Sequence, residues 1–166
     1  MKNNTESNVR QMSEESDVFK KLMSDHRNVE KIFKKLLNTS EDDEDERAEL
    51  FSEVDTLLSA HAKAEEKLFY PKTEANSKTR DLTLEAHEEH ELVKLLLGQL
   101  RDMDPSEEVW GAKLTVLCEL VKHHVKEEEE ELFPKAQKII SKKESKELAH
   151  KIEVFEDAEI ERKGAA

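Results

Sequence analysis

The fold can be worked out from one stretch, His123-His-Val-Lys-Glu-Glu-Glu-Glu-Glu-Leu-Phe-Pro134. Within it, His124 and Glu128 are four residues apart and would share one face of an α-helix. A histidine and a carboxylate so placed can bind the same metal ion, and the carboxylate can also bridge to a second ion. Acidic helices often contain such a pair by chance. The pair therefore indicates a metal site only if the chain repeats it.

The second half of the chain repeats the first at an offset of 63 or 64 residues. The matched positions are His26 and His90, His61 and His124, Glu65 and Glu128, and Pro71 and Pro134. The surrounding words agree as well, since Asp25-His-x-x-Val29 resembles Glu89-His-x-x-Val93. Two similar helical hairpins predict an all-α fold, an up-down-up-down antiparallel four-helix bundle.

Apolar residues at steps of three or four predict the four helices, and polar stretches at 38–46, 74–77 and 104–107 predict the turns. Ser13 is the expected cap of the first helix, Pro71 should end or kink the second, and Pro105 should open the fourth. A capping box beginning at Ser141 predicts an extra C-terminal helix, which docks on the bundle or on another subunit. The expected organisation is a flexible tail at 1–12, the bundle at 13–140, and a C-terminal helix and tail at 141–166.

The positions of the histidines relative to the turns support this bundle. In an antiparallel pair, residues at the same height are equally distant from the connecting turn. The midpoints between successive histidines of the repeat fall at 43.5, 75.5 and 107, at or beside the three turns. An up-down-up-down bundle would therefore bring His26, His61, His90 and His124 to one level of the core.

Four imidazoles and two carboxylates on interior faces predict a metal site. A buried carboxylate without a partner costs several kcal/mol, and each unpaired polar group costs roughly 1–3 kcal/mol. Two cations would satisfy them, and imidazole combined with carboxylate favours iron among the common metals. The only cysteine is Cys118, so a thiolate zinc site is not expected.

Composition narrows the possible functions further. The net charge of −13 disfavours binding to nucleic acid or to an anionic membrane. The apolar runs are only a few residues long, so neither a membrane span nor a signal peptide is expected. With a single cysteine and no such segment, a cytoplasmic location is the expectation.

The pattern H…HxxxE…H…HxxxE, with Glu-Glu-x-Leu-Phe-Tyr-Pro71 and Glu-Glu-Glu-Glu-Leu-Phe-Pro134 around it, resembles the hemerythrin-like (HHE cation-binding) family over about residues 16–140. The resemblance implies two iron ions in an oxo- or hydroxo-bridged non-heme di-iron centre. It also implies that Glu65 and Glu128 bridge the irons and that the four histidines complete their shells. Family members bind oxygen, and some are implicated in peroxide or nitric oxide chemistry or in iron sensing.

The chain departs from the respiratory hemerythrins in one ligand. They carry a second histidine one turn away on the third helix, whereas the one-turn neighbours of His90 are Ala86 and Lys94. His87 is the candidate replacement, either as an added ligand or as an outer group, with a histidine at the boundary of the core as the alternative. His123 is expected at the surface, and Glu127 to Glu131 are expected to form a mostly solvated face, except for Glu128.

These observations leave three functional hypotheses. The first is a di-iron protein that binds O2 or a related small oxidant such as peroxide or NO, for carriage, sensing or storage. The second is a di-iron enzyme that decomposes peroxide or reduces nitric oxide. The third is a metal-free helical bundle that serves a structural or interaction role. The sequence does not indicate an oligomeric state.

Overall fold

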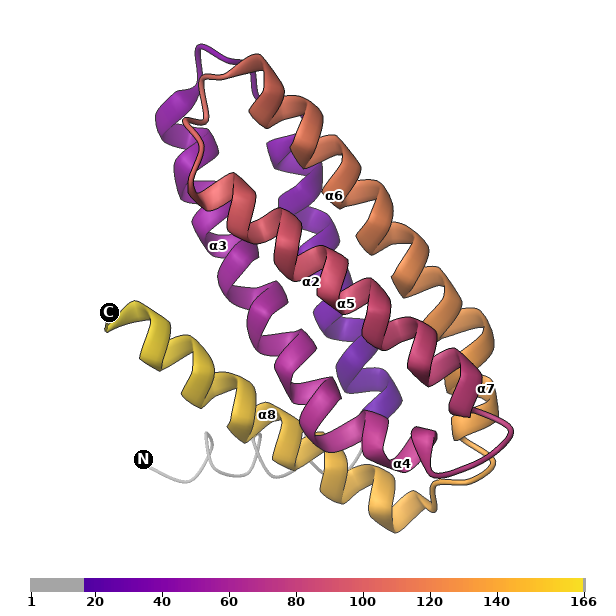
Figure 1. Cartoon of the computed structure of the whole chain (residues 1–166). Helices are drawn as coiled ribbons and strands as arrows, with labels where there is room; N and C mark the ends of the chain where they lie inside the picture. The colour runs from indigo at the N-terminus through magenta and orange to yellow at the C-terminus, as the bar shows by residue number, and fades with distance from the viewer. Residues whose placement is uncertain (1–16, 166) are drawn as a thin grey trace, which may run out of the picture.

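The computed structural model describes residues 17–165, and this part of the chain is helical with short connecting turns. Four long helices, α2, α3, α5 and α6, form an antiparallel bundle, and α8 crosses its side (Figure 1). The bounds are α2 Val18–Leu36, α3 Glu44–Ala64, η1 Glu65–Phe69, α4 Tyr70–Glu74, α5 Arg80–Arg101, α6 Glu108–Glu127, η2 Glu128–Leu132, α7 Phe133–Ala136 and α8 Lys142–Gly164. The four-helix bundle with an extra helix is confirmed.

The predicted apolar faces are the buried faces of the helices. On α2 the buried side chains recur at steps of three or four residues, and His26 lies among them. The helix begins at Val18, where the side chain of Asp17 accepts a hydrogen bond from the backbone N–H of Lys20 at 2.9 Å. The expected cap Ser13 lies outside the described residues.

The core consists of two apolar clusters with a polar layer between them. One cluster surrounds Trp110, and the other surrounds Phe69 and Phe133. His26 follows Leu22 of the second cluster and precedes Val29 of the first along the same buried face. The other three histidines lie at the same level, so the polar layer crosses the whole bundle.

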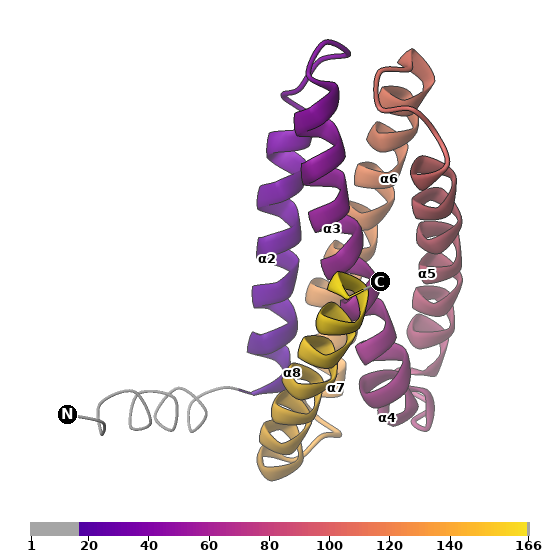
Figure 2. The ribbon, with the colours of Figure 1, turned by 90° about the vertical axis from the view of Figure 1, so that its left-hand side faces the viewer.

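Helix α8 docks on the bundle beside α2 and α3 (Figure 2). The predicted cap is confirmed, because the Oγ of Ser141 accepts a hydrogen bond from the N–H of Glu144 at 3.2 Å. Leu148 and Ile152 are buried against the bundle, and the Oγ of Ser145 accepts a hydrogen bond from the N–H of Val18 at 3.1 Å. The buried side chains in the N-terminal half of α8 therefore fix this half to the bundle at the start of α2.

At Pro71 the helix does not end, and at Pro105 the expected helix start does not occur. Pro71 and Pro134 do not end the second and fourth helices, which continue through the π-helical segments η1 and η2 into α4 and α7. Pro105 does not open α6, because residues 104–107 form a turn and the helix begins at Glu108. None of the helices within residues 17–165 has the length and apolar character that a membrane crossing requires.

Candidate metal centre

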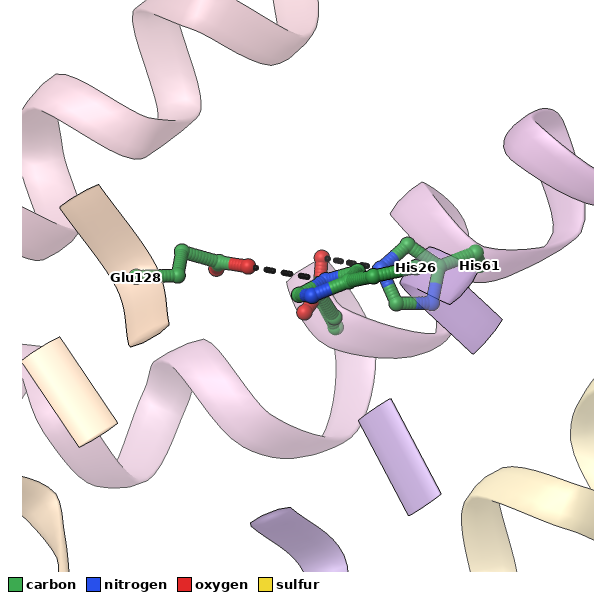
Figure 3. A group of neighbouring side chains, drawn as sticks. His26, His61 and Glu128 are labelled. Carbon is green, nitrogen blue, oxygen red and sulfur yellow. Dashed lines mark ion pairs between the residues drawn. The ribbon is translucent and has the colours of Figure 1, made fainter. Parts of the chain in front are cut away.

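Two pairs of histidines meet two glutamates in the polar layer. The first group of possible ligands is His26 from α2, His61 from α3, Glu65 and Glu128. His26 Nε2 lies 3.3 Å from Glu128 Oε2, and His61 Nε2 lies 3.3 Å from Glu65 Oε2. Figure 3 shows that the side chains of His26, His61 and Glu128 approach one another from separate helices.

The second group shares Glu65 with the first. It consists of Glu65, His90 from α5 and His124 from α6. His90 Nε2 lies 3.4 Å from Glu65 Oε2 and 3.1 Å from His124 Nε2. His124 Nε2 lies 3.6 Å from Glu128 Oε2, so each glutamate stands between the two histidine pairs.

The residues present fit two cations. Several buried atoms that face this centre have no hydrogen-bond partner among the described residues: His26 Nε2, His61 Nε2, both carboxylate oxygens of Glu65 and Oε2 of Glu128. Leaving such groups unpaired in the core is costly. Nitrogen and oxygen atoms grouped within 4.8 Å of one another are the donors that a transition-metal ion accepts. The arrangement thus offers two groups of possible ligands, each with two histidines, and Glu65 belongs to both.

The outward nitrogen of each histidine faces at least one carboxylate. For three of them the distance from Nδ1 is short: 2.8 Å from His26 to Glu129, 3.0 Å from His90 to Glu66 and 2.6 Å from His124 to Glu89. Carboxylates at this position orient a ligand imidazole and make it a better electron donor. His61 Nδ1 instead faces two more distant carboxylates, of Asp25 at 3.7 Å and of Glu156 at 3.6 Å.

This outer layer was missed by the sequence reasoning, which expected Glu129 on a solvated face. Glu129 in fact accepts from His26, and its side chain is 15% exposed. The repeat contains the signal: in each half an acid directly follows the matched glutamate, Glu65 or Glu128, and another acid directly precedes His26 or His90. These acids are Glu66 and Glu129, and Asp25 and Glu89. The remaining carboxylate, Glu156, comes from α8 and has no counterpart in the repeat.

The acidic surroundings determine how the ligands titrate. Burial pulls the pKa of His90 down, but Glu65 and Glu66 outweigh it and raise the pKa to about 9. Burial also opposes protonation of His61 and His26, yet neighbouring carboxylates raise the pKa of both. The partner of His90, Glu66, shifts in the opposite direction. Burial favours its neutral form, but His90 and Lys94 lower its pKa to about 2.

Tyr70 is a further polar group at the centre. Its fully buried hydroxyl donates a hydrogen bond to Glu128 Oε1 at 2.8 Å and lies 3.2 Å from His90 Nε2. Burial and the negative charge of Glu128 raise the pKa of Tyr70 well above its usual value. The phenol therefore keeps its proton at neutral pH, directly beside the possible ligands.

The π-helical segments begin at Glu65 and Glu128. In η1 the N–H of Tyr70 donates to the carbonyl of Glu65, and in η2 the N–H of Phe133 donates to the carbonyl of Glu128. Such wide turns are frequent at functional sites. Tyr70 follows η1 directly, and its hydroxyl donates to Glu128, the first residue of η2.

The structure therefore brings together six of the seven predicted ligands: His26, His61, Glu65, His90, His124 and Glu128. His87 is outside the two central groups, with its side chain 34% exposed. Its ring packs edge-on against Tyr70 at 4.9 Å, and its Nε2 lies 3.8 Å from Glu74. His123 is exposed beside Glu89 and Glu127, as the sequence predicted.

Comparisons with known proteins found similarity in sequence and in fold. Over 125 residues, which are 75% of this chain, the sequence is 30% identical to a protein from Nostoc sp. described as a DNA nickase. The match spans only 35% of that protein. A crystal structure of a hemerythrin HHE cation-binding domain-containing protein from Mycobacterium kansasii has the same fold, with a TM-score of 0.78 and 24% identity over 89% of each chain.

The family itself is identified by sequence. Residues 17–136 match the hemerythrin HHE cation binding domain, and this range contains all four long helices, both π-helical segments and the six clustered residues. Helix α8 lies beyond the match. The chain belongs to the hemerythrin HHE cation-binding domain family and is a metal-binding, hemerythrin-like protein.

Proposed function

We propose that this protein holds two iron ions at the His/Glu centre and binds O2 or a related small oxidant there. The observation that carries the proposal is the set of buried atoms of Glu65, Glu128, His26 and His61 that have no hydrogen-bond partner within residues 17–165 and that cations would satisfy together. Two imidazoles and shared carboxylates for each ion match the donor preference of iron. Bound iron would supply redox chemistry, while the protein residues hold the ions apart and exclude water.

The space next to the histidines supports a small ligand. A cavity of about 20 Å³ is lined by all four histidines and by apolar side chains, among them Val29, Val93, Val121 and Val125. Roughly 10–15 Å³ of such space is needed for one water molecule. A space of this size excludes an organic substrate, which is consistent with a small ligand such as O2, NO or peroxide.

Metal analysis and absorption spectroscopy test this function. We expect freshly purified or iron-reconstituted protein to hold two iron ions per chain and to show near-ultraviolet charge-transfer absorption. The reduced protein should then change its spectrum when O2 is admitted. Fewer than two ions after loading, with no such absorption, would rule out the di-iron centre and favour the metal-free bundle.

A peroxide-decomposing enzyme is the second candidate, and Tyr70 favours it. Converting two molecules of hydrogen peroxide to water and O2 requires protons to move between oxygen atoms, and the hydroxyl of Tyr70 holds a proton 2.8 Å from Glu128. We expect Tyr70→Phe to reduce peroxide turnover about tenfold or more, while the iron content stays at two. Phe69 lies beside Tyr70 and faces the apolar cluster, so Phe69→Leu is the control for packing.

Oxygen release measured with an electrode separates the two candidates. Sustained turnover on repeated additions of peroxide would contradict a pure carrier or sensor. A stable spectrum of the oxygenated protein without turnover would contradict the peroxide-decomposing enzyme, and equal rates in the wild type and Tyr70→Phe would remove Tyr70 from the reaction.

A further inference from the structure

Helix α8 places the buried carboxylate of Glu156 beside Nδ1 of His61, the ring nitrogen that faces away from the proposed metal centre. Glu156 is 7% exposed, although most acidic residues of α8 face the solvent. Its Oε1 has no hydrogen-bond partner in the described part of the chain, and it points toward Nδ1 of His61 at 3.6 Å. His61 Nδ1 is likewise unpartnered.

His61 thus differs from the other three histidines. Their Nδ1 atoms each lie 2.6–3.0 Å from one carboxylate of the repeated hairpins. His61 has Asp25 and Glu156 at longer distances, and one of the two comes from outside the bundle. The pseudo-symmetry of the two halves is therefore broken at this histidine, by the helix that the repeat does not include.

Asp25, His61 and Glu156 are close enough to suggest a third cation site. Lys21 already provides a cation there, since its Nζ lies 2.6 Å from Asp25 and also pairs with Glu156. Its ammonium group neutralises part of the negative charge and holds the two carboxylates together. The cluster is thus better understood as a support for His61 than as another metal site.

We propose that Glu156 is a positioning residue of the metal centre and that it couples the docking of α8 to metal occupancy. A metal at Nε2 of His61 leaves the proton of the ring on Nδ1, where it needs an acceptor, and Glu156 faces that atom. The inference rests on the proposed di-iron function. Because coupling is reciprocal, metal should strengthen the docking of α8, and docked α8 should raise the affinity for metal.

The C-terminal half of α8 is attached more weakly than the N-terminal half, so its docking can depend on metal binding. The N-terminal half is held by the buried side chains of Leu148 and Ile152 and by the hydrogen bond from Val18 to Ser145. From Glu156 onward, ion pairs predominate, including Glu159 with Lys63 at 2.9 Å and Lys163 with Asp55. Ion pairs near the surface contribute little stability, so a new hydrogen bond to His61 would matter there.

A matched pair of variants in the full chain tests the proposal. Glu156→Gln removes the charge behind His61, whereas Glu159→Gln removes an α8–α3 ion pair that does not touch a possible metal ligand. In an anaerobic titration with Fe²⁺ against a competing chelator, we expect Glu156→Gln to bind one of its two ions about 10–100-fold more weakly. Glu159→Gln should remain within about twofold of the wild type.

Hydrogen exchange supplies a second readout that needs no variant. In the wild type, the backbone amides of residues 155–164 should exchange more slowly with iron than without it, and this difference should shrink in Glu156→Gln. Equal iron affinity in the two variants, or no change in α8 exchange when the wild type takes up two ions, would overturn the coupling and leave the di-iron function standing. A wild type that fails to load two ions would instead overturn both.

Discussion

Each of the four histidines presents Nε2 to the centre and Nδ1 to a carboxylate. This division determines how the site exchanges protons for metal. In the metal-free protein, the carboxylates on both sides stabilise the imidazolium form, which explains why the pKa of His90 rises to about 9 despite its burial. A metal ion requires the neutral ring at Nε2, so loading the site must release protons.

The raised pKa of His90 predicts a pH-dependent stability of the metal-free protein. Because the pKa of His90 rises from 6.5 to about 9 on folding, its protonation stabilises the folded state. This stabilisation is fully present below pH 6.5 and is lost as the pH rises through 9. The loss is on the order of 3 kcal/mol at most. We expect the free energy of unfolding, measured with denaturant, to fall between pH 6.5 and 9.5, and iron loading to release more protons at pH 7 than at pH 9.5.

Two comparisons check that the effect belongs to the centre. The iron-loaded protein should show a smaller fall over the same range, because its histidines are held neutral by the metal. His90→Gln should flatten the profile of the metal-free protein, whereas His123→Gln, at an exposed position, should leave it unchanged. A metal-free protein that is equally stable at both pH values would contradict this account.

At the residue scale, the repeat predicted which histidines and glutamates would lie together. Because His26, His61, His90 and His124 are equally distant from their turns, their common level followed from counting residues, and the structure places them together. Glu129 was not recognised, since an acid beside a ligand looks the same in sequence whether it faces water or Nδ1 of a neighbouring helix. Glu156 was beyond reach because the repeat does not extend to its helix.

At the element scale, a surface groove between α2 and α6 lies next to the polar layer. A groove of about 480 Å³ between these helices is lined by Val29, Val121, Val125 and His26, among others. The same four side chains also line the small cavity between the histidines. They thus form a thin wall between the groove and the cavity, and thermal motion of the valines would admit a small ligand.

Thinning this wall should speed ligand entry. We expect Val125→Ala to raise the association rate of azide with the oxidised iron-loaded protein by roughly tenfold, equivalent to a barrier lower by about 1.4 kcal/mol. Stopped-flow absorption measures the rate. Val93→Ala is the matched control, because Val93 lines the cavity but not the groove. Similar rates in both variants would show that the ligand enters elsewhere.

The elements themselves were predicted with differing success. Apolar residues spaced three or four apart predicted each long helix of the bundle, because a helix with one buried face requires that spacing. Pro71 was expected to end or kink its helix, and the helix does not end there, because it continues through a π-helical turn before the proline; Pro134 follows a similar turn. Residues 104–107 resemble a helix start in sequence, but they form a turn instead. The side chain of Asp104 accepts a hydrogen bond from the N–H of Ser106 at 2.9 Å within this turn.

At the scale of the whole molecule, the polar layer joins two apolar clusters that would otherwise be one continuous core. Every long helix of the bundle contributes a histidine to this layer. Two cations there would together be held by side chains from all four helices, and they would satisfy the atoms of Glu65 and Glu128 that have no partner among residues 17–165. Metal binding should consequently stabilise the entire fold rather than one segment of it.

The size of this stabilisation and its dependence on Glu128 form the last prediction. Free iron at 100 times its dissociation constant adds about 2.7 kcal/mol, which raises the Tm of a domain of this size by roughly 5–11 °C. Glu128→Gln keeps the shape of the side chain but removes the bridging charge, so the rise in Tm on adding iron should fall to a small fraction of that value. Glu130→Gln, at an exposed position two residues away, should keep the full rise. The comparison uses the difference between loaded and metal-free Tm, because the substitution also removes the pairing of Glu128 with His26 and His124 in the metal-free state. An equal rise in both variants would mean that Glu128 does not hold the metal.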